Sequence, residues 1–180
     1  MIYLHVYESV ENSKAFSKKK LFNNLSFYLN KNPKDIVLKR NENGKPYVDG
    51  LFFSVSHSQD KIVQAFTTDD EIGIDLEYRQ VDRPYLRLAK RYFHEHEYGA
   101  LVKLSDQQSL SLFYNLWTAK EAVCKAQGGR LWYYLHENYM TSTTQILPLM
   151  HAMKLQHLNI IPQFSLCIAS NAQTIKVQYD

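Results

Sequence analysis

Two acidic side chains inside an apolar segment constrain the fold of this chain more than any other feature. Residues 73–77 read Gly-Ile-Asp-Leu-Glu, an apolar stretch that favours a β-strand. In a strand, Asp75 and Glu77 point to the same face of the sheet because they lie two residues apart. Like charges held this close repel each other and raise each other's proton affinity unless a cation lies between them. The pair therefore predicts a bound cation.

The chemistry of the ligands indicates which cation is expected. Asp75 and Glu77 offer only carboxylate oxygens, and Mg²⁺ is commonly held by one or two protein carboxylates. Mg²⁺ keeps its remaining positions for water and for the phosphates of a substrate. The acid pair therefore predicts a magnesium site and indicates phosphate chemistry.

A second constraint comes from residues 109–127. This stretch favours a helix because Ala, Glu, Lys and Leu dominate around it and neither Gly nor Pro occurs before Gly128. Trp117, Glu121 and Lys125 recur every four residues and therefore share one face. We expect Glu121 to join the acid pair and Lys125 to meet a phosphate. Taken alone, Glu121 and Lys125 also fit an ordinary helix pair worth about 0.2–0.5 kcal/mol, so both interpretations stay open here.

Composition limits the class of protein. The chain has 180 residues, 45% of them apolar, which excludes disorder and fits one domain or two small halves. A net charge of +3 is too small for a protein that coats nucleic acid. Cys124 and Cys167 lie without partners at metal-ligand spacing, as expected of free thiols in a reducing compartment. We find neither a signal-peptide pattern nor an apolar run of ~18 residues, so we expect a cytoplasmic protein without a membrane segment.

The predicted elements alternate between helices and short strands. In the first part we expect a helix, a short strand, a turn, a hairpin with a polar bend, and a third strand that completes an antiparallel meander, at residues 13–30, 36–38, 41–46, 51–67 (bend 56–60) and 72–76. After a loop at 81–84 we expect helices at 85–93, 95–104 and 109–127 and a closing hairpin at 164–169 and 174–179. This pattern predicts an α+β fold with an N-terminal half, residues 1–80, and a C-terminal half, residues 81–180.

Five segments in this order resemble the 4′-phosphopantetheinyl transferases of the surfactin-synthetase-activating type. They are Gly44-Lys45-Pro46, Phe53-Ser54-Val55-Ser56-His57-Ser58, the strand at 73–77, residues 89–93 with Glu97, and residues 113–125 around Trp117-Thr118-Ala119-Lys120-Glu121. No single segment is specific, whereas five in order are. The resemblance extends from about residue 36 to residue 131 and implies two similar α+β halves in one chain, a pseudo-dimer that is monomeric in solution.

The resemblance also implies an activity. It implies Mg²⁺-dependent transfer of the 4′-phosphopantetheine arm of coenzyme A to a serine of an apo acyl or peptidyl carrier protein, with release of adenosine 3′,5′-bisphosphate. Such carriers serve fatty acid, polyketide or nonribosomal peptide biosynthesis. Asp75, Glu77 and Glu121 match the metal ligands of the family. Glu121, or a metal-bound water that it orients, is the implied general base, and Lys125 is implied to stabilise phosphate charge.

Further positions match the family's coenzyme A site. His57 matches a histidine that contacts a coenzyme A phosphate and is also expected to take part in catalysis, and Ser56 beside it is implied to contact the nucleotide. Lys45-Pro46 matches a loop against the adenine and the 3′-phosphate. Lys18 is our placement for a basic residue that contacts the 3′-phosphate. The other matches are Lys120, which also fits a plain helix-face charge, and a carrier-docking surface near residues 79–93.

Three other interpretations remain open. A small trimeric holo-carrier synthase would catalyse the same reaction with one half-length domain per subunit, but the length of the chain and its two-part motif favour a single-chain pseudo-dimer. A Mg²⁺-dependent nucleotide phosphohydrolase would use the same three acids without a protein acceptor. A non-enzymatic module would use the basic residues to bind coenzyme A, another anion, RNA or a partner protein. The weak net charge and the lack of interleaved aromatic and basic motifs disfavour RNA.

Overall fold

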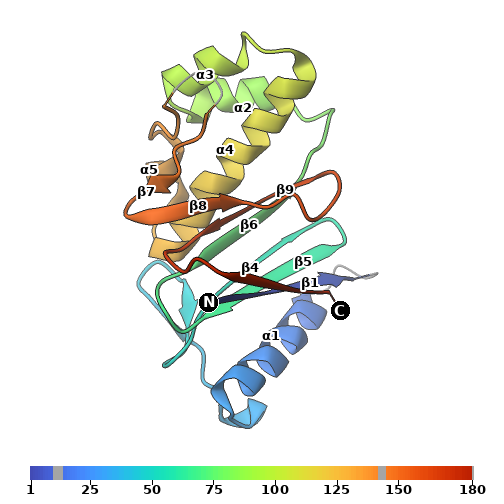
Figure 1. Ribbon diagram of the computed structural model, residues 1–180, viewed down its shortest axis with the longest axis vertical. Helices are drawn as coiled ribbons and strands as arrows, with labels where there is room; N and C mark the ends of the chain where they lie inside the picture. The colour runs from blue at the N-terminus through green and yellow to red at the C-terminus, as the bar shows by residue number, and fades with distance from the viewer. Residues whose placement is uncertain (10–13, 142–144, 180) are drawn as a thin grey trace.

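A computed structural model describes residues 1–9, 14–141 and 145–179 of the chain and confirms a mixed α+β fold (Figure 1). The first part contains β1 (Ile2–Glu8), α1 (Lys14–Leu29), the 3₁₀ turn η1 (Pro33–Asp35), β2 (Lys39–Arg40), β3 (Pro46–Tyr47), β4 (Phe52–Ser58), β5 (Lys61–Thr67) and β6 (Gly73–Tyr78). It is followed by α2 (Tyr85–Tyr92), α3 (Glu95–Leu101), α4 (Asp106–Gln127), α5 (Leu131–Leu135), β7 (Leu149–Met150), β8 (Met153–His157), β9 (Phe164–Ala169) and β10 (Ile175–Tyr179).

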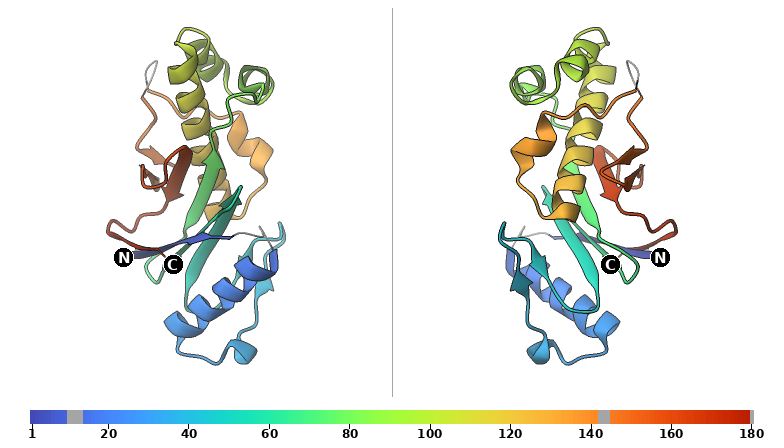
Figure 2. Two further views of the ribbon diagram at one scale, coloured as in Figure 1. Left: turned by 90° about the vertical axis from the view of Figure 1, so that its right-hand side faces the viewer. Right: turned by 90° about the vertical axis from the view of Figure 1, so that its left-hand side faces the viewer.

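The first sheet has the strand order β10-β1-β5-β4, and α1 covers one of its faces (Figure 2). Strands β1, β5 and β4 pair antiparallel, whereas β10 pairs with β1 in parallel. Helix α1 packs through Leu25 against Phe53 of β4 and Phe66 of β5. The helix therefore lies beside β4, and its residues Lys14 and Lys18 line the same cavity as His57 of that strand.

The second sheet has the order β6-β9-β8-β7, and α4 packs along β6 and β9. Because side chains alternate along a strand, Ile74 and Leu76 of β6 lie in an apolar core that the two sheets share. Asp75 and Glu77 face the opposite way, toward α4. The alternation that predicted this strand thus places its apolar residues in the core and its acids against the helix.

Gly73 permits a close approach between β6 and α4. A Cβ atom at this position would lie 1.8 Å from the backbone oxygen of Ala122 and 2.5 Å from the backbone nitrogen of Ala126. Such distances are too short for any side chain, so only glycine fits. The backbones of strand and helix meet directly here, which brings the charged face of α4 onto the acids of β6.

Strands β4 and β6 belong to different sheets and are joined by side chains. The backbone N–H groups of Ile74, Leu76 and Tyr78 donate to the hydroxyls of Ser54, Ser56 and Ser58 at 3.0, 3.2 and 2.9 Å. We call Ser54, Ser56 and Ser58 the serine ladder. The ladder satisfies β6 N–H groups that face β4, and it fixes the position of β6 relative to the first sheet.

The strand pairing corrects two expectations. Strand β6 pairs with β9 and not with β5, so the meander was wrong. Strands β9 and β10 were found at the expected residues but lie in different sheets, so they form no closing hairpin. The division at residue 80 and the likeness of the halves stay predictions. The pairing shows that each predicted half contributes a strand to a sheet of the other.

Two local expectations were also wrong. Residues 36–38 form no strand, because Asn32 and Pro33 begin a 3₁₀ turn and Ile36 then packs into the core beneath α1. The short strands lie instead at β2 and β3, on either side of the 41–45 turn. Strand β4 continues through Ser58, so His57 lies within a strand and not in the bend.

The helices predicted after residue 84 were confirmed as α2, α3 and α4, with α3 ending at Leu101.

None of the helices in the described ranges combines the length and the apolar character that crossing a membrane requires.

Candidate active site

The three carboxylates predicted to converge lie together. Asp75 and Glu77 come from β6 and Glu121 comes from α4, and each offers an oxygen within 4.8 Å of those of the other two. The arrangement follows from the two periodicities read in the sequence, two residues in the strand and four in the helix. An all-oxygen group of this kind suits a hard divalent cation such as Mg²⁺.

Asp75 is the most deeply buried member, with 1% of its surface exposed. Its Oδ1 accepts a hydrogen bond from Ser56 Oγ at 2.9 Å and from Lys125 Nζ at 2.6 Å. Its Oδ2 is buried and has no hydrogen-bond partner in the described part of the chain. A buried carboxylate oxygen without a partner is costly, and a cation would satisfy it. The residues present therefore fit a metal site.

Burial and mutual repulsion raise the proton affinity of the other two acids. Burial, followed by the charge of Asp75, raises the pKa of Glu77 to about 7, against the opposing charges of Arg83 and Lys125. The same two causes raise the pKa of Glu121 to about 8. The indole Nε1 of Trp117 donates to Glu121 Oε1 at 2.8 Å and holds the side chain. A divalent cation would relieve this repulsion and ionise both groups.

Lys125 links the acids to a cavity. Its Nζ lies 2.6 Å from Asp75 Oδ1 and 3.8 Å from Glu121 Oε2. Burial lowers the pKa of Lys125, but the facing acids Asp75, Glu121 and Glu77 outweigh this and raise it above its usual value. The side chain therefore stays an ammonium at neutral pH, while 31% of it remains exposed toward the cavity.

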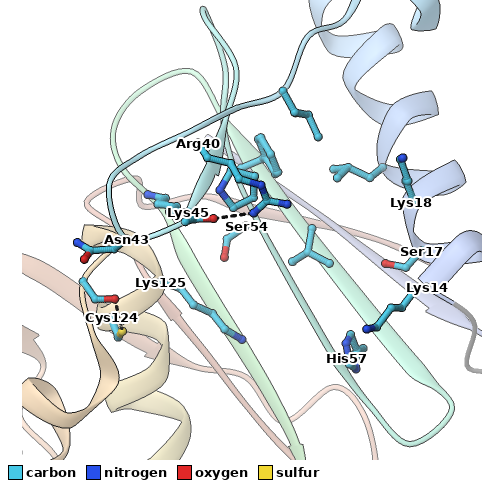
Figure 3. A pocket seen from close by; sticks show the side chains of 18 residues that line it. Lys14, Ser17, Lys18, Arg40, Asn43, Lys45, Ser54, His57, Cys124 and Lys125 are labelled. Atoms are coloured by element: carbon cyan, nitrogen blue, oxygen red, sulfur yellow. Dashed lines mark hydrogen bonds between the residues drawn. The ribbon is translucent and has the colours of Figure 1, made fainter.

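The cavity has a volume of about 660 Å³ and lies between α1, β4, the 40–46 loop and the C-terminal end of α4 (Figure 3). Its described lining contains five basic side chains, a histidine, an apolar wall and no acidic side chain; these are Lys14, Lys18, Arg40, Lys45 and Lys125, then His57, then Leu21, Leu38, Pro46, Phe53 and Val55. Cations beside an apolar wall suit a ligand that joins several phosphates to an apolar or aromatic group.

Most of the predicted ligand-binding residues line this cavity. Lys18, Pro46, His57 and Lys125 do so from four different elements. Lys45 also lines it, but its ammonium group bonds to the carboxylate of Glu71 and to the backbone oxygen of Ala126. Its charge is therefore partly used to hold the loop against the end of α4.

Two other predicted residues do not line the cavity. Ser56 is absent from the described lining, and its hydroxyl bonds to protein groups. Lys120 is fully buried, with Nζ 2.9 Å from Glu97 Oε2 and 3.1 Å from the backbone oxygen of Leu135. Lys120 therefore holds α5 and α3 against α4, which favours a structural role.

Lys14 and Arg40 line the cavity although sequence reasoning did not select them. Lys14 precedes Lys18 by four residues and so shares its helix face, a signal that was available. Arg40 lies beside the loop that carries Lys45, and its Nη1 donates to the backbone oxygen of Gly44 at 2.7 Å. No sequence pattern singles out Arg40, because its position depends on how the loop folds.

Comparisons with known proteins concern the part of the chain that carries the acids. Residues 71–164 match the model of the 4′-phosphopantetheinyl transferase superfamily. The chain is similar to the 4′-phosphopantetheinyl transferase HetI of Nostoc sp., with 38% identity over 110 residues, which are 58% of this chain and 46% of that protein. It is also similar to the 4′-phosphopantetheinyl transferase gsp of Aneurinibacillus migulanus, with 37% identity over 52% of this chain and 39% of the relative.

A third relative is the 4′-phosphopantetheinyl transferase ffp of Bacillus subtilis, with 34% identity over 54% of this chain and 43% of that protein. The chain thus spans less than half the length of each of these curated relatives. Asp75, Glu77, Glu121 and Lys125 fall inside the family match, whereas the cavity residues from α1 and the 40–46 loop lie before it.

Proposed function

Because the chain belongs to the 4′-phosphopantetheinyl transferase superfamily, we propose that it transfers the 4′-phosphopantetheine arm of coenzyme A to a serine of an apo acyl or peptidyl carrier protein. The by-product is adenosine 3′,5′-bisphosphate. The observation that carries this proposal is the position of three convergent carboxylates at one end of a cavity that is rich in cations. Lys125 contacts Asp75 and also lines the cavity, so the acids and the cavity adjoin each other.

In this proposal Asp75, Glu77 and Glu121 hold Mg²⁺. The bound ion supplies Lewis-acid polarisation of the pyrophosphate. The unpartnered oxygen of Asp75 and the raised pKa values of Glu77 and Glu121 support the assignment, since they indicate that Lys125 alone does not balance the three acids.

Coenzyme A occupies the cavity with its phosphates on the basic residues. Lys125 lies next to the acids and therefore takes the pyrophosphate. Lys18 and Lys14 of α1, together with His57 of β4, take the 3′-phosphate, and Lys45 and Pro46 bound the adenine. The cavity volume of about 660 Å³ falls in the range of ligand sites that bury most of a small molecule.

The residues around the pyrophosphate supply positioning and charge, which are the main contributions in phosphoryl transfer. The serine oxygen of the carrier forms a new bond to the phosphorus of the arm, while the bond from that phosphorus to the bridging oxygen breaks. The serine proton passes to Glu121, directly or through a water that Glu121 orients. Lys125 donates to the leaving phosphate and stabilises its negative charge. General-base assistance of this kind contributes about 10²–10⁴-fold in rate.

One experiment tests the proposal. The protein is incubated with coenzyme A, Mg²⁺ and a panel of apo carrier domains, and each carrier is weighed by mass spectrometry. We expect one carrier or more to gain the mass of a single phosphopantetheine arm, with an equal amount of adenosine 3′,5′-bisphosphate. Asp75→Ala and excess chelator serve as negative controls.

Each alternative gives a different outcome in the same experiment. Release of phosphate or nucleotide without a modified carrier would identify a phosphohydrolase, and binding of coenzyme A without any product would identify a binding module. Gel filtration tests the expected monomer, because a trimer would indicate the small holo-carrier synthase type.

A further inference from the structure

The joint between β4 and β6 passes through the acid group. The two strands lie in different sheets, and the serine ladder bridges them with one hydroxyl for every second residue. Ser54 and Ser58 occupy the two ends of the ladder, and Ser56 lies at its centre. The centre is also where the side chain of Asp75 leaves β6.

Ser56 makes more contacts than a ladder position requires. Its Oγ accepts from the Leu76 N–H at 3.2 Å and from Lys125 Nζ at 3.0 Å, and it donates to Asp75 Oδ1 at 2.9 Å. A serine hydroxyl has one donor and two acceptor positions. All three are used by protein groups, and the residue is only 5% exposed.

We propose that Ser56 is a positioning residue that fixes Asp75 and Lys125 for a bound divalent cation. It does not contact coenzyme A, the role that resemblance implied. The hydroxyl has no hydrogen-bonding position left for a phosphate, and the described cavity lining includes the neighbouring Val55 and His57 but not Ser56.

The geometry explains how the hydroxyl acts. Ser56 and Lys125 both hold Oδ1 of Asp75, which leaves Oδ2 as the oxygen that can bind a cation. Without the hydroxyl, only the flexible side chain of Lys125 holds Oδ1. The carboxylate can then rotate and present either oxygen to the ammonium, so that Lys125 competes with the cation. Loss of such a supporting hydrogen bond typically lowers metal affinity about 10–100-fold.

Ser58 provides a matched control. Its hydroxyl accepts the Tyr78 N–H at 2.9 Å, as Ser56 accepts that of Leu76, but within the described ranges it bonds neither to a carboxylate nor to Lys125. Ser56→Ala and Ser58→Ala therefore each remove one ladder bond, and only Ser56→Ala removes a contact to the acids. Any effect of the ladder on folding should be common to both variants.

The first test uses Mn²⁺ as an oxygen-preferring probe of the site, with binding to the full chain followed by electron paramagnetic resonance in the absence of coenzyme A. We expect Ser56→Ala to bind Mn²⁺ about 10–100-fold more weakly than the unmodified chain. Ser58→Ala should bind it with unchanged affinity. Equal losses in the two variants would overturn the proposal, because the effect would then belong to the ladder alone.

A second measurement separates positioning from contact with the ligand. Calorimetric titration of coenzyme A in the presence of a chelator should give the same affinity for Ser56→Ala as for the unmodified chain. A clear loss of affinity would show that Ser56 contacts coenzyme A and would refute the positioning role. If Ser56→Ala does not fold, Ser56→Cys keeps the side-chain volume with a much weaker donor and should show the same loss of Mn²⁺ binding. Retained Mn²⁺ binding in Ser56→Cys would overturn the proposal.

The kinetic consequence rests on the proposed transfer activity. We expect Ser56→Ala to lower kcat about 10–100-fold with little change in the KM for coenzyme A. If the unmodified chain transfers no arm, the proposed function fails while the Mn²⁺ measurement still tests Ser56. If the unmodified chain transfers the arm and Ser56→Ala binds Mn²⁺ normally, the function stands and the role of Ser56 is refuted.

Discussion

Helix α4 carries two lysines that each pair with a buried acid, and the two pairs differ in what they leave unsatisfied. Lys120 and Glu97 are both fully buried. Glu97 Oε1 also accepts from the Tyr139 N–H at 2.8 Å, so this pair is closed by protein groups. Lys125 remains 31% exposed, and its partner Asp75 keeps one oxygen without a partner among the described residues. The open pair leaves an oxygen and an ammonium group available for the metal and ligand proposed above, whereas protein groups satisfy the closed pair.

The electrostatics of the two pairs differ in the same way. Burial lowers the pKa of Lys120 to about 8 although Glu97 opposes it. Burial also lowers the pKa of Lys125, but three acids surround it and raise the pKa overall. The excess of acid around Lys125 calls for a further cation, whereas at Lys120 the effect of burial exceeds that of Glu97 and Glu137. Identical residue types in one helix therefore serve different purposes because of their neighbours.

The largest expected effect breaks the open pair. Asp75→Ala removes the carboxylate that supplies the free oxygen, and it should lower transfer by at least about 10³-fold, which corresponds to several kcal/mol of transition-state stabilisation. The fold should persist, because the bonds lost to Ser56 and Lys125 are offset by relief of the repulsion among the three acids. Carrier modification by mass spectrometry and thermal unfolding together check this, and near-native transfer in Mg²⁺ would falsify the metal assignment.

Breaking the closed pair should affect stability instead. Lys120→Met leaves Glu97 buried without its cation, and removal of one partner of a buried pair costs about 3–5 kcal/mol of unfolding free energy. Denaturant unfolding measures this loss. Lys125→Met is the matched comparison. It also leaves a buried acid, Asp75, but with Mg²⁺ present it should cost clearly less, because the proposed cation would compensate the charge that the lysine leaves behind. Adding Glu97→Leu to Lys120→Met should restore part of the stability, and equal losses for both lysines would contradict the contrast.

A pH series sharpens the contrast, because the acids around the open pair have pKa values that are raised toward neutrality. Glu77 and Glu121 have folded-state pKa values of about 7 and about 8, above the ordinary value of 4.5. The folded chain therefore binds protons more tightly than the unfolded chain, so stability without metal should fall as pH rises from about 4.5 toward 8.

Added Mg²⁺ should remove this fall by pairing with the ionised acids. Thermal unfolding with a chelator and with Mg²⁺ across this range provides the measurement. Glu77→Gln should flatten the curve obtained with the chelator. Identical curves with and without Mg²⁺ would argue against a metal at these acids.

The smallest expected effect concerns the loop beside the open pair. Lys45→Ala removes a cation from the cavity and a bond to the end of α4. We expect the affinity for coenzyme A to fall about tenfold, in line with a charged hydrogen bond of about 1.5 kcal/mol, with kcat at saturating coenzyme A nearly unchanged. Calorimetric titration measures the affinity, and an unchanged value would remove Lys45 from the ligand site.

The part of the site that could be predicted depends on local periodicity. Asp75 and Glu77 share a face in any strand, and Glu121 and Lys125 share one in any helix, so their grouping needed only that the two elements meet. The two lysines of α4 could not be told apart, because burial of Lys120 depends on Glu97 and on the carbonyl groups of α5. Glu97 and these carbonyl groups lie in α3 and α5, and the spacing of residues along the sequence does not determine where these two helices pack against α4.

The strand partners could not be predicted for a related reason. The alternation of β6 determines which of its side chains face the core, but strands pair through backbone groups at their edges. The pattern therefore does not select between β5 and β9, which lies about ninety residues away. Strands β9 and β10 are joined by a short connection and resemble a hairpin, yet they enter separate sheets. The role of Ser56 could not be predicted for the same reason, because the partners of its hydroxyl depend on how β4 packs beside β6.

Gly73 determines the distance between β6 and α4. Where hydrogen bonds or ion pairs set a distance, a longer or shorter side chain can often compensate, but here the spacing between β6 and α4 is a contact of bare backbones. The gap available to an ion between the two elements is thus determined by atomic radii at a residue with no functional group. The distance between Asp75 and the charged face of α4 therefore depends on the absence of a side chain two residues earlier in the strand.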